Sequence, residues 1–499
     1  MSVQNTEHKF TMKEIKLQSK FPIKTPESSS KTETFIGYDK RSLEKQHHVT
    51  SNKIPFIATA IASLSLVSFG YMLGYTALAI PQLTTDEAQI ELSENSVAWF
   101  GSLIMLGAFI GSIIAGRMID HFGRQCTLIT LSIPATIGWF IIVSAQTVTA
   151  LLAGRILTGI SLGMSSVSYS VYMSEISTAS MRGLLGGSIQ FAISTGYILN
   201  ASIGMITTWR YSAIAGQAIA TILAIGMVFM PESPHWLIAN GYRKTAIDTL
   251  RRLRGPEANI NFELTEIESL KHRQQIKYSE LWSPSVRKPF LISLFLLIAQ
   301  KWTGFHSVLF FCPYILRMAG FQDFRLIILI MAISQFVGSG VGYALAGRFS
   351  RVKLLLSCSA LMTVSGALLG VYFYLLEAMS LNLLWLSFIS TCGYVLGFNI
   401  SWGGLAYAIM SEILPLRARG VASGLSASVG FLAAFAASYA FLPLAQAISV
   451  QGSLWFYTGL NVLIAIIVFY CVPETKGKKF SDIEKIFDKK KRMDKTTMV

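Results

Sequence analysis

The stretch SEISTASMRG, residues Ser174–Gly183, returns later in the chain as SEILPLRARG, residues Ser411–Gly420. Both copies begin with Ser-Glu-Ile and end with Arg-Gly. A second pair, PES at Pro231 and PET at Pro473, follows in the same order. The members of each pair are separated by about 240 residues, which indicates an internal duplication. The sequence therefore predicts two homologous halves, and transporters built from repeated halves bind substrate near the midplane between them.

The composition indicates that the chain crosses a membrane. Of its 499 residues, 52% are hydrophobic and only 14% are charged, against roughly 25% charged in an ordinary soluble domain. Because lipid offers no water to hydrogen-bond the backbone, apolar runs of about 20 residues are predicted to be helices. About twelve such runs begin near Ile54, Val97, Cys126, Thr149, Leu184, Trp209, Pro289, Phe324, Lys353, Leu381, Val421 and Ser453. The predicted fold class is an all-α membrane protein with twelve transmembrane helices in two pseudo-symmetric six-helix bundles.

Polar segments separate and flank the two predicted bundles, which cover residues 54–230 and 289–472. Residues 1–53 are rich in Lys, Ser and Thr, show no removable signal peptide and are expected to be a disordered tail. Residues 231–288 are expected to form a small cytoplasmic helical linker, which is interpreted as a tether rather than a regulatory domain. Residues 473–499 form the expected C-terminal tail.

The formal charge of +15 is concentrated in alternate connections between the predicted spans. These basic clusters are Arg117–Arg124, Arg243–Arg254, Arg348–Lys353, Arg417–Arg419 and Lys476–Lys479. The first connection on the opposite side carries acidic residues instead, including Glu91 and Glu94. By the positive-inside rule, both termini and the linker are predicted to be cytoplasmic. The charge therefore orients the chain in lipid, and nucleic acid is not expected as a partner.

Several motifs together resemble the sugar porters of the major facilitator superfamily. They are GRMIDHFGR, GRILTGISLGMSSVSYSVYMSEISTASMRGLLGGSIQ, PESPHWLI, QKWTGFHSV, SEILPLRARG and PETKG, and they occur in the family's order over nearly the whole chain. Within that family, GYTALA and LRGPEANINFELTEI are similar to the insect-type facilitated trehalose and hexose transporters. The resemblance implies the major facilitator fold and the transport of a small sugar.

Charged residues at the predicted cytoplasmic helix ends form a candidate gate. Glu175 and Glu412 end spans where the helix dipole disfavours a carboxylate unless a cation is near. An ion-pair network there would hold the cytoplasmic side shut while the site faces outward. The resemblance implies the same role for Arg117, Arg124, Glu175, Arg182, Arg351, Glu412 and Arg419. The alternative is that these residues only orient helix ends in water. Since Gly347 replaces the family's usual acid, we expect a weaker pair in the second half.

The central site is predicted from polar residues inside apolar runs. The resemblance aligns Gln190, Gln300 and Gln335 with amide residues of the sugar site. Amides suit a hydroxyl-rich ligand because they both donate and accept hydrogen bonds. Lys301 and His306 replace further amides of the family, and Tyr407 takes the position of an aromatic residue that stacks on the sugar. Their alternatives are a cavity lysine without substrate contact for Lys301 and ordinary packing for His306 and Tyr407.

The way transport is driven is predicted from an absence in the sequence. The predicted spans contain no Asp or Glu away from their ends, and intramembrane carboxylates are the usual proton carriers. Thr76 stands where proton-coupled sugar porters tend to have an aspartate, so Arg155 lacks that acid. We therefore expect facilitative transport, driven only by the substrate gradient.

Three functions remain open at this stage. The preferred one is a facilitative carrier of a sugar such as trehalose or a hexose, working by alternating access in the plasma membrane. A carrier of the same fold with an anionic or otherwise non-sugar substrate is the second, because Lys301 and His306 alter the site. A non-transporting solute sensor is the third. No catalytic, cofactor or metal pattern is recognisable, so the chain is not expected to be an enzyme, and no protein partner is indicated.

Overall fold

The computed structural model describes residues 53–84, 90–177, 179–256, 258–271, 278–318, 321, 323–380, 383–415, 418–476 and 478. The side chains of residues 179–188, 270, 271, 278 and 318 lie outside this description. The predicted tail over residues 1–53 therefore falls outside the described residues except for Lys53, and so does most of residues 473–499.

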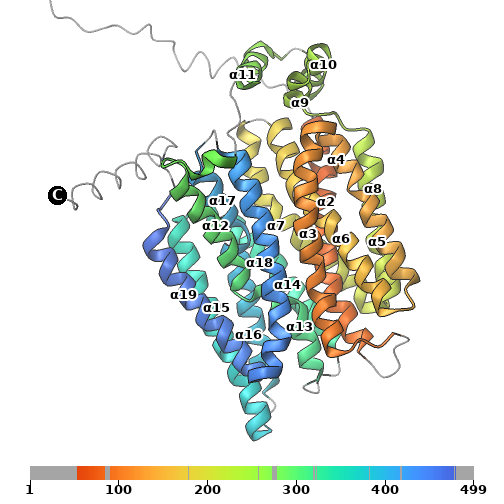
Figure 1. The fold of residues 1–499 in the computed structure, drawn as a ribbon, viewed down its shortest axis with the longest axis vertical. Coiled ribbons are helices and arrows are strands. Elements are labelled where there is room, and N and C mark those ends of the chain that lie inside the picture. The colour runs from red at the N-terminus through yellow and green to blue at the C-terminus, as the bar shows by residue number, and fades with distance from the viewer. Residues whose placement is uncertain are drawn as a thin grey trace, which may run out of the picture. The chain divides into compact units, whose positions relative to one another are not determined.

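Six spans form the first half, which we call the N half (Figure 1). Its helices are α2 (Ile54–Leu83), α3 (Glu94–Phe122), α4 (Arg124–Thr130), α5 (Ser132–Ser144), α6 (Val148–Ile176), α7 (Ala179–Ile206) and α8 (Trp209–Val228). Helices α4 and α5 together make the third span. Polar caps begin two of these helices: Ser93 accepts a hydrogen bond from the Ser96 amide at α3, and Thr147 accepts one from the Ala150 amide at α6.

A helical linker joins the two halves and lies at one end of the bundle (Figure 1). It comprises α9 (Pro234–Ala239), α10 (Arg243–Arg254), α11 (Asn261–Lys271) and the short 3₁₀ helix η2 (Tyr278–Trp282). We call this end the linker face and the opposite end the far face. The linker has its own small core, in which Leu237, Ala246 and Leu250 are buried together.

Six further spans form the second half, the C half. Its helices are α12 (Arg287–Trp302), α13 (Phe305–Met318), α14 (Phe324–Ala346), α15 (Arg351–Met379), α16 (Leu384–Gly397), α17 (Gly403–Ile413), α18 (Arg419–Ile448) and α19 (Val450–Cys471), with the π-helical turn η3 (Phe398–Trp402) between α16 and α17. Within the described residues, 12 helical segments are long and apolar enough to cross a membrane. The predicted fold class, two six-helix bundles with a helical linker, is confirmed.

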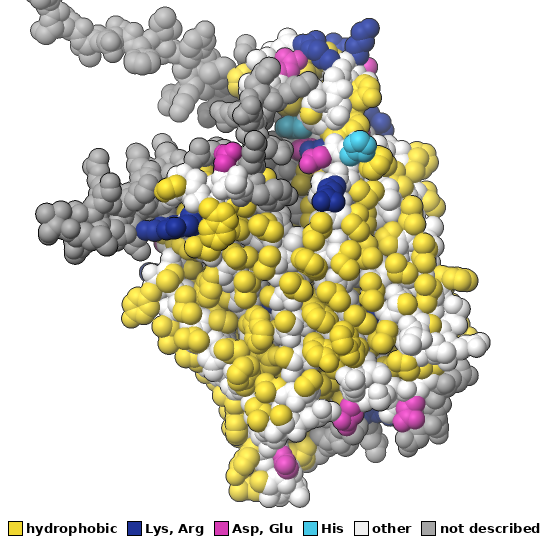
Figure 2. All heavy atoms as spheres, viewed as in Figure 1, with side chains coloured by type: hydrophobic (Ala, Val, Ile, Leu, Met, Phe, Trp, Pro, Cys, Tyr) yellow, Lys and Arg dark blue, Asp and Glu magenta, His cyan; other side chains and the backbone are white. Residues whose placement is uncertain are grey.

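The surface supports the same conclusion. Hydrophobic side chains cover the middle of the face seen in Figure 2, while charged side chains gather toward its two ends. Large apolar residues such as Phe140 and Phe469 are 71% and 63% exposed. An apolar band between charged ends is the surface that a bilayer requires.

Glycines bring neighbouring helices into close contact. A Cβ atom at Gly107 or Gly111 of α3 would collide with backbone atoms of α6, and one at Gly159 or Gly163 of α6 would collide with backbone atoms of α3. Small residues four apart on one helix allow two backbones to approach this closely. The halves themselves meet where α3 packs on α18 and α7 packs on α14.

Two spans of the C half are broken near their middle. The seventh span ends as α12 at Trp302 and restarts as α13 at Phe305, and Gly304 between them has a φ of 84°. The tenth span passes through η3, a π-helical turn. Such turns leave backbone groups open and are frequent at functional sites. The apolar run from Phe290 to Leu316, read as one span in the sequence, is therefore two helices.

Candidate substrate site and charge network

The central polar cluster is built where the two broken spans meet. Gln300 lies in the last turn of α12 and is 1% exposed. Its Nε2 donates a hydrogen bond of 2.6 Å to the Trp402 carbonyl oxygen in η3. The hydroxyl of Tyr394 donates to the carbonyl of Thr303 at the break itself. Each interruption thus has a carbonyl that accepts a hydrogen bond from a side chain of the other span.

A hydrogen bond joins the two halves at this level. Gln190 of α7 donates from Nε2 to Oδ1 of Asn399 in η3, at 2.9 Å. The neighbouring rings of Phe191 and Phe336 also meet across the halves, with centroids 4.7 Å apart. Close approach is possible because position 403 is glycine: a Cβ there would lie 2.9 Å from Cδ of Gln190. Gln190 therefore lies at the interface between the halves, as a substrate site between them requires.

Gln335 lies on α14, next to the same turn. It is 1% exposed, and its Oε1 has no hydrogen-bond partner among the described residues. One turn further along α14, a Cβ at Gly338 would lie 3.0 Å from Cβ of Asn399. The structure thus gathers Gln190, Gln300 and Gln335 around η3. Tyr407 is placed less centrally, on α17 beyond η3, where it packs as a partly buried residue against the hydrophobic core.

Lys301 and His306 lie on opposite sides of the break in the seventh span. Lys301 is 7% exposed and belongs to the last turn of α12. The negative end of the helix dipole stabilises a cation there, which explains how a lysine is accommodated at this depth. His306, in the first turn of α13, is surrounded by the rings of Phe305, Phe310 and Phe398.

Arg155 of α6 is fully buried without a carboxylate partner among the described residues. Its guanidinium donates to the carbonyls of Phe100 and Met72 at 3.3 Å each and to the hydroxyl of Thr76. The guanidinium carbon also lies 4.9 Å from the centroid of the Phe100 ring. Neutral oxygens and an aromatic face therefore satisfy this cation.

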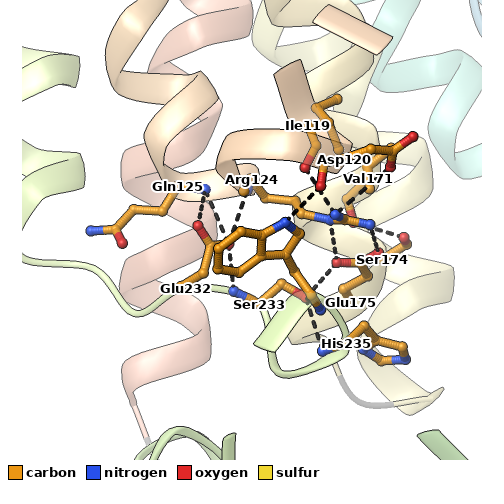
Figure 3. A network of polar contacts seen from close by, with 12 residues as sticks. Ile119, Asp120, Arg124, Gln125, Val171, Ser174, Glu175, Glu232, Ser233 and His235 are labelled. Carbon is orange, nitrogen blue, oxygen red and sulfur yellow. Dashed lines mark hydrogen bonds and ion pairs between the residues drawn. The ribbon is translucent and has the colours of Figure 1, made fainter. Parts of the chain in front are cut away.

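The linker face of the N half holds a dense ion-pair network (Figure 3). Arg124 donates from Nε and Nη2 to the two carboxylate oxygens of Glu175, at 2.8 and 2.9 Å. The Ser233 hydroxyl donates to the same carboxylate. Oδ1 of Asp120 lies 3.9 Å from Nη1 of Arg124. The network therefore joins the start of α4, the end of α6 and the linker.

Glu232, from the PES motif, lies between α8 and α9, and its carboxylate caps the start of α4. Its carboxylate accepts hydrogen bonds from the backbone amides of Arg124, Gln125 and Ser233, at 2.7 to 3.2 Å. Burial raises the pKa of the Glu232 carboxyl above its ordinary value, although these amides and Arg124 act in the opposite direction.

The C half repeats this arrangement with fewer contacts. Arg351 donates a single hydrogen bond of 3.2 Å to Glu412. Glu474, from the PET motif, accepts from the Ser350 hydroxyl and from the amides of Arg351, Val352 and Lys476. Burial would raise the pKa of Glu474, but the Ser350 hydroxyl and these amides outweigh it and hold the pKa below its ordinary value.

The remaining predicted gate residues contribute less to these pairs. Arg419 donates to the Leu414 carbonyl at 3.3 Å and lies close enough to Glu412 for an electrostatic interaction. Arg117 is exposed and forms no ion pair within the described part of the chain. The Arg182 side chain lies outside the described residues. The ion pairs that the structure describes at this face join helices of the same half, rather than one half to the other.

Sequence reasoning missed four participants in these sites. Asn399 is one polar residue within a predicted span and carries no motif of the site, yet its side chain bridges the halves. Gly304 stands inside the motif QKWTGFHSV, and the only signal that the sequence gives for the break is that glycine readily adopts a positive φ. Glu232 and Glu474 were visible only as parts of the PES and PET repeat, and the repeat itself was the signal.

A family model described as "Sugar (and other) transporter" matches residues 58–487 of this chain. The chain belongs to this sugar transporter family. It is 30% identical over 453 residues to the facilitated glucose transporter member 8 of solute carrier family 2 from Mus musculus, covering 87% of this chain and 94% of that protein. It is also 30% identical over 496 residues to the facilitated trehalose transporter Tret1 of Apis mellifera ligustica, covering 98% and 96% of the two chains.

Solved structures show the same fold. The partially occluded, inward-open xylose transporter XylE from E. coli superposes with a TM-score of 0.73 at 24% identity, covering 86% of this chain and 100% of that one. This likeness confirms the predicted fold, and the family model and the relatives at 30% identity confirm the predicted sugar porter membership. The protein is a multi-pass membrane transporter, and its relatives are transporters rather than enzymes.

Proposed function

We propose that this sugar transporter is a facilitative carrier of trehalose or a hexose that works by alternating access. Its substrate site lies at the interface between the halves, lined by Gln190, Gln300 and Gln335, with Lys301, His306 and Tyr407 contributing. The observation that carries the proposal is the hydrogen bond from Gln190 to Asn399, because it places amide groups of both halves in one cluster. Bound sugar hydroxyls would replace such amide contacts.

The environment of Arg155 supports transport without proton coupling. Within the described spans, acidic residues stand only at or near helix ends. Arg155 is satisfied by carbonyl groups, the Thr76 hydroxyl and an aromatic ring. Since none of these groups exchanges a proton near neutral pH, the surroundings of Arg155 offer no carrier for one. Relatives named as facilitated transporters of glucose and trehalose agree with this mechanism.

The contacts between the halves support an alternating-access cycle. At the far face, Gln446 of α18 donates to Glu94 of α3 at 2.6 Å, and the Trp99 and Tyr439 rings lie 4.7 Å apart. At the linker face, the described ion pairs stay within each half. This is the arrangement expected of an inward-facing carrier if the linker face is cytoplasmic, as its basic residues favour. In the outward-facing state, the gate residues Arg117, Arg124, Glu175, Arg182, Arg351, Glu412 and Arg419 would join the halves.

Counterflow in proteoliposomes tests the proposal. Vesicles containing the purified chain and loaded with unlabelled trehalose or glucose should accumulate the same labelled sugar, while protein-free vesicles should not. Absence of exchange for both sugars would contradict the assigned substrates. In a second assay, an imposed pH gradient, acidic outside, should not drive net accumulation of labelled sugar into empty vesicles, because no proton moves with the sugar. Accumulation that depends on this gradient and is abolished by a protonophore would contradict passive transport. Surface labelling of epitope-tagged termini in intact cells tests the expected plasma-membrane location and orientation.

A further inference from the structure

The environment of Lys301 carries an inference about which solutes this carrier selects. Lys301 is only 7% exposed, and within the described residues its side chain forms no hydrogen bond or ion pair. Two nearby backbone carbonyls already accept hydrogen bonds from other groups: Ala299 accepts one from the Thr303 amide, and Gln300 accepts one from the Thr303 hydroxyl. The ammonium is thus stabilised by the end of α12 but remains available as a donor.

No carboxylate of the described spans is placed to neutralise this ammonium. In the C half, the spans carry Glu377 near the far-face end of α15 and Glu412 near the linker-face end of α17. Glu377 accepts a hydrogen bond from Gln451, and Glu412 accepts one from Arg351. Both lie at helix ends, whereas Lys301 lies at the break in the middle of its span. A negative charge that meets Lys301 must therefore arrive with a ligand.

Three acceptor groups of the proposed substrate site define the rest of that ligand. Oε1 of Gln300, Oε1 of Gln335 and Nδ1 of His306 are buried and lack hydrogen-bond partners among the described residues. His306 also lies within electrostatic range of Lys301. Amide oxygens accept hydrogen bonds, as does an unprotonated imidazole nitrogen. These acceptors match the hydroxyl groups of a sugar, and Lys301 matches one anionic group on it.

We infer that the site binds sugar acids, hydroxylated monoanions with one carboxylate, more tightly than neutral sugars of the same ring configuration, and that Lys301 recognises the carboxylate. The inference rests on the proposed sugar carrier and specifies its substrate class. His306 borders the same site on the α13 side of the break. The acceptor groups bind the hydroxyls that neutral and acidic sugars share, so neutral sugars remain substrates.

The test compares ligands that differ only in charge. D-glucuronate and D-glucuronamide share ring and hydroxyl groups, and only the first is an anion at neutral pH. Binding of each to the purified full-length chain in detergent is measured by titration calorimetry. We expect glucuronate to bind at least about tenfold more tightly, as one charge-assisted hydrogen bond supplies. Lys301→Arg should keep this preference, and Lys301→Gln should reduce the affinity ratio to about one.

The outcomes separate this inference from the proposed function. Equal affinities in the unmodified chain, no glucuronate binding at all, or a preference that survives in Lys301→Gln would each overturn the inference. Counterflow of labelled glucose with the same protein preparation reports the carrier activity independently. Glucose exchange without a glucuronate preference removes only the role of Lys301. If the chain binds and prefers glucuronate but exchanges neither glucose nor trehalose, the inference is supported and the assignment of neutral substrates is overturned.

Discussion

In the N half, Arg124 donates two hydrogen bonds to Glu175, whereas in the C half Arg351 donates one longer bond to Glu412. The side chains of the first pair are 13% and 15% exposed, and those of the second are 20% and 27% exposed. The C half also contains the span interrupted at Gly304, which has a left-handed backbone, and the span that passes through the π-helical turn η3. The same duplicated plan thus gives a tightly held N half and a more adjustable C half. We interpret the N half as the support on which the C half changes shape.

The largest expected difference concerns the two arginines. Arg124→Ala should lower the free energy of unfolding by about 2 to 3 kcal/mol, because it leaves a partly buried carboxylate without its charged donor. Arg351→Ala should cost about 1 kcal/mol, since its pair is more exposed and has one bond. Thermal unfolding of the two purified variants in the same detergent measures this order. Equal losses, or a larger loss for Arg351→Ala, would remove the contrast between the halves.

The next effect tests whether the break in the seventh span requires glycine. Gly304→Ala should destabilise the protein by about 2 kcal/mol, from the left-handed backbone and from a Cβ that would lie 2.9 Å from Cβ of Tyr457. Gly241, in the linker, is the matched control because it also has a positive φ, 86°, but has open space around the added Cβ. Gly241→Ala should cost about 1 kcal/mol. Similar melting temperatures for the two variants would show that the break adds no packing constraint.

The smallest expected effect is a difference in pH dependence between the two motif glutamates. The pKa of Glu474 lies below its ordinary value of 4.5, so this residue contributes stability above that pH and loses it as the pH falls through the lowered pKa. The pKa of Glu232 lies above 4.5, so its contribution is greatest below pH 4.5 and is lost as the pH rises through the raised pKa.

Melting temperatures of Glu474→Gln and Glu232→Gln, measured against the unmodified chain from acid to neutral pH, test this sign. The difference for Glu474→Gln should shrink on acidification. The part of the melting-temperature difference for Glu232→Gln that arises from ionisation of Glu232 should instead grow on acidification. Parallel pH curves for the two variants would contradict the assigned environments of the carboxylates.

The sequence predicts the large-scale organisation because hydropathy and repetition report it directly. Runs of apolar residues predict the spans, and the paired Ser-Glu-Ile motifs predict the two halves. The break at Gly304 was not predicted, because an apolar composition does not report backbone φ. Asn399 could not be placed either, since its role depends on a contact with Gln190, 209 residues away in sequence.

The measurement that tests the central claim most directly is the half-saturation concentration for sugar counterflow in Gln300→Ala. Loss of this buried amide from the proposed site should raise that concentration about tenfold, equivalent to about 1.4 kcal/mol of binding energy. Gln217→Ala, which removes an amide of α8 that contacts Thr136 and Thr221 away from the site, serves as the matched control and should leave it unchanged. If Gln300→Ala folds and transports sugar with an unchanged half-saturation concentration, the substrate site does not lie where the broken spans meet.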